Sequence, residues 1–266
     1  MYLTEENKKA RRGSRKRETA DRASGADAAD WARRKLSFSP DAVQEQVLKT
    51  QGRRLVMNCT RQWGKSTVTA AKAVHQAYTE AESLTLVVSP STRQTGKFLR
   101  KAGDFLRRLN MVPRGDGDNE MSLMLPNRSR IVGVPGNEAG VRGFSAVCLL
   151  LVDEAARVED GTYLAMRPML AVSNGTMWLM STPFGKRGFF YEAWTDGGEE
   201  WERVRVPAEA CPRIRREFLE EERRTMGERW FRQEYQCEFV DTVGGIFDRE
   251  VVHRAITREV KPLEFD

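Results

Sequence analysis

The segment of residues 55–67 constrains the fold of this chain more than any other. It begins with apolar residues typical of a strand, passes through a polar turn and continues into Gly64-Lys65-Ser66. Apolar residues at helical spacing follow, so the sequence predicts a strand, a loop and the start of a helix. Such a loop directs backbone N–H groups and the positive end of a helix dipole at one point, which suits a polyphosphate.

The loop matches the phosphate-loop pattern G-x-x-x-x-G-K-[ST], except that Cys59 occupies the position of the first glycine. In this pattern Lys65 contacts the β- and γ-phosphates and the Ser66 hydroxyl binds magnesium. An isolated Gly-Lys-Ser tripeptide is more often the start of an ordinary surface helix. The preceding strand and the motifs that follow in the chain reverse this preference.

The second motif is Asp153-Glu154, which directly follows the apolar run of residues 147–152. A fully apolar strand indicates burial on both faces in a parallel sheet. Acids at the carboxyl end of such a strand lie where open α/β sheets bind ligands. We therefore predict that Asp153 holds a magnesium ion, directly or through water, and that Glu154 polarises the attacking water.

Other apolar runs predict the remaining strands, at residues 85–89, 176–180 and 201–206 and as a pair of short strands within 121–134. The segment after residue 90 has helical spacing and a basic face, which is either a DNA track or a solvated surface. Together the patterns predict an α/β fold of the P-loop NTPase class, RecA/ASCE-like, with a mainly parallel sheet flanked by helices.

Composition divides the chain into four predicted parts. Residues 1–34 lack hydrophobic periodicity and contain a run of Lys and Arg, which predicts a disordered basic arm. Residues 35–210 form the predicted ATPase core, residues 211–247 a small helical lid, and residues 248–266 a C-terminal tail. The arm either adds salt-sensitive contacts to DNA phosphates or is a solvated tail without a partner.

The formal net charge of +6 favours a polyanionic partner. No apolar run approaches the roughly 20 residues that a membrane-spanning helix requires, and the N-terminus has no secretory signal pattern. The four cysteines are scattered, without the paired spacing of zinc sites. We therefore expect a soluble intracellular protein with no membrane contact, no disulfide framework and no zinc site.

In their order along residues 38–247, these motifs resemble the ATPase domain of the large terminase subunit of tailed double-stranded DNA bacteriophages. The sequence R-Q-W-G-K-S at residues 61–66 is similar to that family's variant phosphate loop, in which Arg follows a non-glycine first position. Arg61 and Lys65 are then expected to neutralise phosphates. The resemblance implies nucleotide contacts from Gln44, Thr60, Arg61, Gln62, Trp63, Gly64, Lys65, Ser66 and Thr67.

The resemblance also implies roles outside the phosphate loop. Gln44 and Gln46 both have the side chain that reads adenine, and the similarity of residues 40–44 to the family's adenine-reading segment favours Gln44. Ser181 and Thr182 resemble the coupling motif that reports hydrolysis. Arg142, in a glycine-flanked loop before the apolar strand, is the expected arginine finger for a neighbouring subunit.

In that family the ATPase works as a ring on the portal of an empty procapsid and drives double-stranded DNA inward. The resemblance therefore implies ATP and Mg2+ as cofactors, and DNA, the portal protein, the small terminase subunit and further copies of the chain as partners. The expected location is the cytoplasm of the bacterial host. The family's nuclease domain would begin near the end of this chain, so we expect no nuclease activity. Truncation, a split gene and prophage decay all remain open.

Two other functions share some of these features. A nucleic-acid helicase or translocase also has a phosphate loop and an Asp-Glu pair, but it needs a second RecA-like domain for which the chain has no room. A non-catalytic assembly protein, left over from a prophage terminase, would not need Lys65, Ser66, Asp153 and Glu154. The retention of all four favours a working ATPase.

Overall fold

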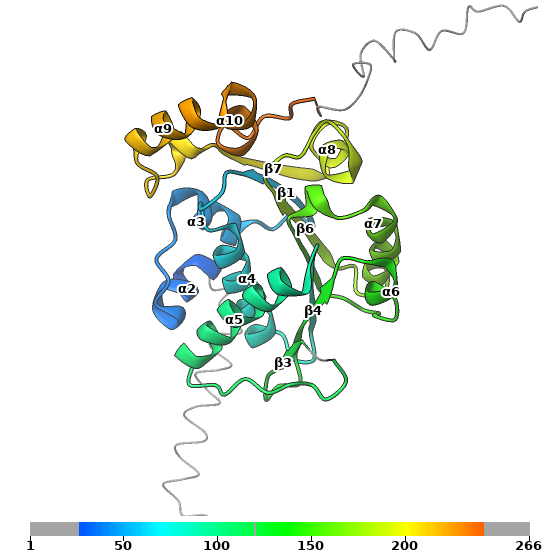
Figure 1. Ribbon diagram of the computed structural model, residues 1–266. Coiled ribbons are helices and arrows are strands. Elements are labelled where there is room, and N and C mark those ends of the chain that lie inside the picture. Colours follow the sequence, from blue (N-terminus) through cyan, green and yellow to red (C-terminus); the bar gives the residue numbers. More distant parts are fainter. Residues whose placement is uncertain (1–26, 120, 242–266) are drawn as a thin grey trace, which may run out of the picture.

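The computed structural model of this protein describes residues 27–119 and 121–241. One sheet of seven strands, in the order β3-β4-β2-β5-β6-β1-β7, forms its centre (Figure 1). Neighbouring strands are parallel, except that β3 is antiparallel to β4. The predicted mainly parallel sheet is thus confirmed. Its strands are β1 (Arg54–Cys59), β2 (Leu84–Ser89), β3 (Ser122–Met124), β4 (Arg130–Pro135), β5 (Leu149–Asp153), β6 (Thr176–Ser181) and β7 (Trp201–Val206).

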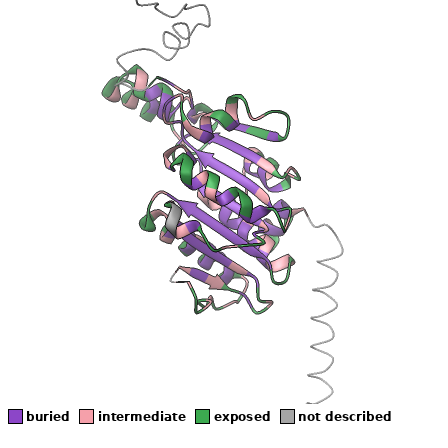
Figure 2. Ribbon diagram, turned by 90° about the vertical axis from the view of Figure 1, so that its right-hand side faces the viewer, coloured by how far each residue is buried: buried purple, intermediate pink, exposed green. Residues whose placement is uncertain are grey.

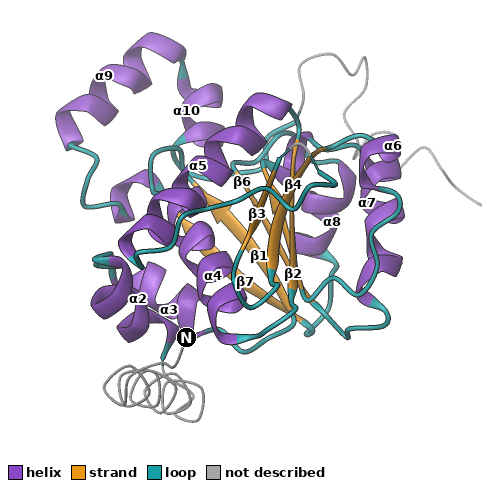
Figure 3. Ribbon diagram, turned by 90° about the horizontal axis from the view of Figure 1, so that it is seen from below, coloured by secondary structure: helices purple, strands orange, loops and turns teal. Residues whose placement is uncertain are grey.

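Helices cover both faces of this sheet, and Figure 3 shows the strands lying between the two helical layers. Helices α2 to α5 lie on one face and α6 to α8 on the other, whereas α9 and α10 pack at the β7 end of the domain (Figure 1). The helices are α2 (Ala28–Leu36), α3 (Ala42–Lys49), α4 (Lys65–Thr79), α5 (Thr92–Arg108), α6 (Glu138–Val141), α7 (Asp160–Met166), α8 (Gly188–Thr195), α9 (Arg216–Met226) and α10 (Glu228–Glu234).

Burial explains why the central strands read as continuous apolar runs. Every residue of β2 and β5 is buried, because helices cover both of their faces (Figure 2). Alternate residues of β5 belong to different cores: Leu151 packs with α2 to α5, and Leu150 and Val152 pack with α7 and α8. Strands β2 and β5 therefore have no solvent-exposed face. No described helix has both the length and the apolar character needed to cross a bilayer.

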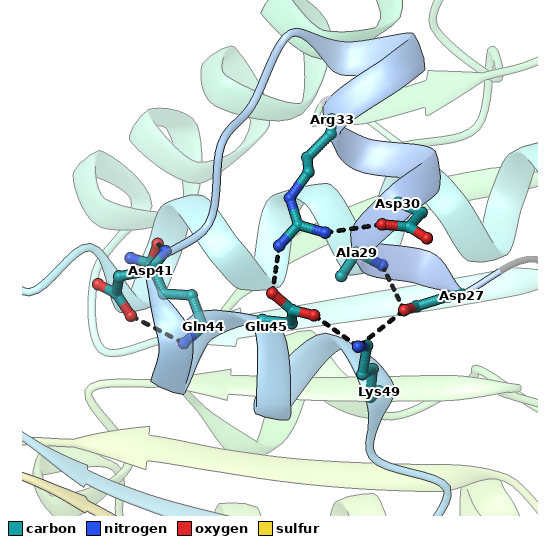
Figure 4. Close-up of polar contacts among 8 residues, drawn as sticks. All are labelled: Asp27, Ala29, Asp30, Arg33, Asp41, Gln44, Glu45 and Lys49. Carbon is teal, nitrogen blue, oxygen red and sulfur yellow. Dashed lines mark hydrogen bonds and ion pairs between the residues drawn. The ribbon is translucent and has the colours of Figure 1, made fainter.

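The predicted boundary of the disordered arm at residue 34 is wrong. Helix α2 begins after Asp27, whose side chain accepts a hydrogen bond from the Ala29 amide, and Trp31 is buried at 1% exposure. Ion pairs also join α2 to α3 (Figure 4): Lys49 contacts Asp27 at 2.9 Å, and Arg33 contacts Glu45. The folded domain therefore begins no later than Asp27. Residues 1–26 of the predicted arm lie outside the described residues, as do the end of the predicted lid and the predicted tail.

The two helices α9 and α10 have a small core of their own, with Leu219, Phe231 and Tyr235 at its centre. Their connection to the sheet is direct. Asn58 of β1 donates a hydrogen bond to the Cys237 carbonyl at 2.8 Å, and Thr60 donates one to the Glu234 carbonyl at 3.0 Å. The end of α10 and the residues just after it are thus fixed to the end of β1, which leads into the phosphate loop.

Candidate functional site

A pocket of about 740 Å³ lies where the carboxyl ends of neighbouring strands converge. Strands β5, β6 and β1 are adjacent and parallel, so the loop after β1 and the acids that end β5 reach the same edge of the sheet. Residues of this loop, of the start of α4 and of α5 line the pocket, together with Glu154, Arg157 and Arg213. This is the position that open α/β sheets use for ligands.

The loop after β1 has the backbone geometry of an anion cradle. Gly64 has φ of 99°, where a side chain is strained, and an added Cβ would lie 3.0 Å from Gln44 Nε2. Gln62 is also left-handed, at φ 65°. Helix α4 starts at Lys65 without a side-chain cap, and the Thr67 amide donates to the Gly64 carbonyl at 2.9 Å. The amides of Lys65 and Ser66 are therefore the ones that a ligand in the pocket could use.

Two contacts join the start of α4 to the acids after β5. Lys65 Nζ lies 3.1 Å from Glu154 Oε1, and Ser66 Oγ donates a hydrogen bond to Asp153 Oδ2 at 3.0 Å. Glu154 has φ of 54°, a left-handed conformation directly after the strand. The two motifs predicted from the sequence therefore meet in space.

Asp153 has an unusual electrostatic environment. Its side chain is almost fully buried, and this burial raises the pKa of the carboxyl above its ordinary value, although nearby Lys65 opposes the shift. A buried carboxylate next to a hydroxyl is stabilised when a cation binds between them. The oxygen donors of Asp153 and Ser66 are those that Mg2+ prefers. Within residues 27–119 and 121–241, no group of three or more His, Cys, Asp or Glu side chains could hold a metal without other ligands.

A chain of charged contacts continues from Glu154 to the lid. Arg157 Nη1 lies 3.3 Å from Glu154 Oε2 and donates a hydrogen bond to Thr182 Oγ1 at 3.2 Å. Its Nη2 atom lies 3.5 Å from Glu234 Oε1, on α10. The other oxygen of Glu234 lies 2.7 Å from Nε of Arg61. Arg157 thus links Glu154, Thr182 and the C-terminal end of α10.

Of the two glutamines considered for contact with the adenine base, only one lies at the pocket. Gln44 is buried and lines the pocket. Its side-chain Nε2 donates to the Trp63 carbonyl at 3.0 Å, and its side-chain Oε1 accepts from the backbone amide of Asp41 at 3.1 Å. Gln46 is exposed and lies outside this pocket. The structure therefore places Gln44, and not Gln46, where the resemblance favours it. Trp63 contributes its backbone to the pocket, while its indole is buried in the core.

The prediction that Thr60 contacts the nucleotide is not supported by the geometry. Its side chain is fully buried and donates to the Glu234 carbonyl, and its amide donates to the Val206 carbonyl at 2.9 Å. Both of its donors are thus used within the protein. By contrast, Arg61 and Gln62 are exposed at the pocket, and Thr67 lines it from the first turn of α4.

Two further candidates lie away from the pocket lining. Arg142 is exposed in the turn after α6 and does not line the pocket in the part of the chain that is described. Ser181 is fully buried at the end of β6, and its hydroxyl has no hydrogen-bond partner among the described residues. Of the two coupling candidates, Thr182 is therefore the one whose side chain is connected to Glu154, through Arg157.

Several pocket residues were missed by the sequence analysis. Lys97 and Lys101, on α5, line the pocket, and burial lowers the pKa of Lys101. Their spacing of four on one helical face was a visible signal, but it was interpreted as a DNA track or a solvated surface. Arg213 pairs with Asp41 at 3.0 Å, across the chain, and no local pattern indicates this contact. The missed residues that line the pocket are Phe38, Ser39, Gln94, Lys97, Lys101, Arg157 and Arg213.

Comparisons with known proteins agree with this geometry. The family model described as "Terminase large subunit, T4likevirus-type, N-terminal" matches residues 56–254. The large terminase subunit of Thermus phage G20c is 25% identical over 247 residues, which cover 80% of this chain and 51% of that protein. This chain therefore spans about half the length of the curated relative it matches.

Solved structures show the same fold. The large terminase ATPase domain of Thermus phage P74-26 is 22% identical, with a TM-score of 0.67, and the match covers 78% of this chain and 96% of that domain. The large terminase of the thermophilic bacteriophage D6E, in complex with ADP, is 13% identical with a TM-score of 0.61, covering 81% of this chain and 53% of that protein.

Proposed function

Because this chain belongs to the T4likevirus-type large terminase subunits, of which it matches the N-terminal part, we propose that it is an ATP-hydrolysing motor for packaging double-stranded DNA into a phage procapsid. Its fold is that of a P-loop NTPase. One observation carries the proposal: Lys65 and Ser66, at the uncapped start of α4, contact Glu154 and Asp153, respectively, at the edge of a pocket. The ADP complex of the D6E relative supports a nucleotide as the occupant.

The polyphosphate of ATP would bind against the phosphate loop, with Lys65 and Arg61 as its cations. Lys65 Nζ lies 3.1 Å from Glu154 Oε1, so the phosphates would compete with Glu154 for the ammonium group of Lys65. Transfer of Lys65 to the phosphates would leave the Glu154 carboxylate able to accept a hydrogen bond from the attacking water. Glu154 would thus act as the water-positioning base.

Ser66 and Asp153 would hold the magnesium ion, which neutralises phosphate charge when it is bound. Thr182 would couple hydrolysis to the rest of the protein, because Arg157 connects its hydroxyl to Glu154. Arg142 is exposed outside this pocket, a position that supports a role at the pocket of a neighbouring subunit. A ring of subunits on the portal protein, assisted by the small terminase subunit, completes the proposal.

The first test measures ATP binding and Mg2+-dependent turnover separately. Lys65→Ala should weaken both, because its ammonium contacts phosphates already in the ground state. Glu154→Gln should bind ATP normally and turn over at least about a hundredfold more slowly, the scale of a general-base contribution. The matched control is Glu217→Gln, an exposed acid on α9, which should behave like the wild type. Near-normal turnover in Glu154→Gln would remove Glu154 from the mechanism.

The second test asks whether Arg142 acts between subunits. Arg142→Ala and Glu154→Gln should each be nearly inactive, whereas a mixture should recover ATPase activity at interfaces that pair an intact Arg142 with an intact Glu154. Co-assembled mixtures that never exceed the separate activities would assign Arg142 a role within its own subunit. We also propose that the chain does not cleave DNA; progressive nicking of supercoiled plasmid with Mg2+ or Mn2+ would contradict this.

A further inference from the structure

Helix α5 carries two separate polar stripes, one on each side of its buried face. Its buried residues are Thr95, Phe98, Leu99, Ala102, Gly103, Phe105 and Leu106. Gln94, Lys97 and Lys101 recur at spacings of three and four and line the nucleotide pocket. Arg100 and Arg107 line a different hollow of about 530 Å³ beside β3. At 3.6 residues per turn, the two stripes lie on opposite borders of the buried face, so only the first belongs to the nucleotide pocket.

The nucleotide pocket holds more positive charge than nearby carboxylates neutralise. The cationic side chains that line it are Arg61, Lys65, Lys97, Lys101, Arg157 and Arg213. All except the two lysines of α5 pair with acids, at Glu234, Glu154 and Asp41. Within residues 27–119 and 121–241, neither Lys97 nor Lys101 forms an ion pair with a carboxylate. These two lysines are therefore the cations of the pocket that a bound anion would satisfy.

The charged neighbours of Lys101 are the side chains expected at the terminal phosphate. Burial lowers the pKa of Lys101, Asp153 opposes this shift, and Lys65 and Lys97 add to it. In the phosphate-loop pattern Lys65 contacts the β- and γ-phosphates. Glu154, the proposed water-positioning base, lines the same pocket as Lys101. The position of Lys101 therefore fits a contact with the phosphates of the nucleotide.

The arrangement of the two lysines is unfavourable without an anion. Lys97 and Lys101 are four residues apart on α5, where like charges destabilise a helix. Lys101 is also half-buried, and burial disfavours the charged form of an ammonium group. Phe98 and Phe105 anchor the neighbouring face of α5 in the core, so rotation of the helix would not relieve this. An anion that contacts both ammonium groups would offset both costs.

We propose that Lys101, with Lys97 at the more exposed side of the pocket, binds the γ-phosphate of ATP within its own subunit and so allows the pocket to distinguish ATP from ADP. The proposal rests on the proposed function and names the substrate recognition of that site. The γ-phosphate is the group that ADP lacks, so contacts to it separate the two nucleotides. The same ammonium groups would stabilise the charge that spreads over the oxygens of the transferred phosphoryl group. Lys101 would therefore contribute to turnover as well as to binding.

The test uses Lys101→Met, which keeps the apolar stem of the side chain and removes its charge. A fluorescent, slowly hydrolysed ATP analogue should bind about tenfold more weakly, the scale of a hydrogen bond to a charged group, whereas fluorescent ADP should lose less than about twofold. The kcat for ATP should fall as well, and Lys101→Arg, which keeps the charge, should recover part of both losses. Equal losses of affinity for the ATP analogue and for ADP would overturn the proposal.

Arg100→Met is the matched control, because Arg100 is the neighbouring cation of α5 on the other stripe. It should leave both affinities and the kcat measured without DNA unchanged. A selective loss of the ATP analogue in Arg100→Met, as large as that in Lys101→Met, would show that the general charge of α5 is responsible and would contradict a specific contact from Lys101.

Melting curves separate this role from a structural one. Without nucleotide, Lys101→Met should melt no lower than the wild type, because it removes a half-buried charge that has no ion-pair partner among the described residues. Its stabilisation by the ATP analogue should be smaller, in line with the lost affinity. A clearly lower melting temperature without nucleotide would assign Lys101 a structural role and overturn the proposal. If the wild type binds both nucleotides and Lys101→Met shows no selective loss, the inference fails alone. If the wild type binds no nucleotide, the proposed function fails with it.

Discussion

Removal of the Trp31 side chain should destabilise the whole domain, although it lies far from the pocket. Trp31, on α2, is 1% exposed and packs edge-on against His75 at 5.0 Å and against Tyr78 at 5.4 Å. Both rings belong to α4, the helix that starts at the phosphate loop. Trp31→Ala would leave a cavity between α2 and α4.

The expected size of the effect follows from this burial. A fully buried Trp→Ala change costs about 3 to 5 kcal/mol in free energy of unfolding. For a domain of this size, about 1 kcal/mol shifts the melting temperature by roughly 2 to 4 °C, so Trp31→Ala should melt roughly 6 to 20 °C lower. Binding of an ATP analogue to the folded variant should be unchanged, because Trp31 does not line the nucleotide pocket.

A second substitution makes this prediction sharper. Trp31 Nε1 is buried and has no hydrogen-bond partner among the described residues. Trp31→Phe therefore loses some packing but also removes an unsatisfied donor, which costs about 1 to 3 kcal/mol while it is buried. We expect the Phe variant to melt close to the wild type. If circular-dichroism melts place the Ala variant within about 2 °C of the wild type, α2 is not part of the core.

Three further predictions concern buried titratable groups. Burial raises the pKa of Asp153, so above its ordinary pKa of 3.8 the ionised carboxylate destabilises the folded state. Asp153→Asn should therefore have a higher melting temperature than the wild type without nucleotide at pH 7. The difference between the two melting temperatures should narrow as the pH falls toward 3.8. Burial lowers the pKa of His75 to about 4. The stability that neutral His75 contributes above pH 6.5 should therefore be lost as the pH falls toward 4, by up to about 3 kcal/mol in free energy of unfolding. In denaturant titrations, His75→Phe should not show this loss. Burial raises the pKa of Cys59 and raises that of Cys237 to about 12. Ellman's reagent should therefore react quickly only with the half-buried Cys148. Cys148→Ser should abolish this fast phase of the reaction.

The sequence alone correctly predicts those features of the fold that a short stretch of residues specifies. The apolar residues before Cys59 predict a strand, and the apolar run before Asp153 predicts a strand buried on both faces. Both strands are found. Because parallel strands end at one edge of a sheet, the meeting of Lys65 with Glu154 followed from the order of the motifs.

Helix α2 shows a signal that was present but misinterpreted. Ala28, Ala32 and Leu36 recur every four residues and are all buried, which is a helical face. The basic run that precedes them dominated the composition of residues 1–34, so the predicted boundary fell inside the helix. Composition over a long window thus concealed a short helix that only its packing stabilises.

The contacts of the lid could not be predicted, because they join residues far apart in the chain. Nothing near Glu234 indicates that its carboxylate meets Arg61 and Arg157, and nothing near Arg213 indicates Asp41. Such pairs depend on how α9 and α10 are placed against the sheet, which hydrophobic periodicity does not specify. The same limit explains why the basic face of α5 remained ambiguous between DNA and solvent.

Glu234 joins α10 to the phosphate loop through contacts of two kinds. Consecutive residues of the phosphate loop contact Glu234 in different ways: Thr60 binds its backbone carbonyl, and Arg61 binds its carboxylate. A substitution that removes the carboxylate charge would break the second contact and leave the first. Because the Thr60 contact does not involve the carboxylate, Glu234→Gln should leave the C-terminal end of α10 attached to the end of β1.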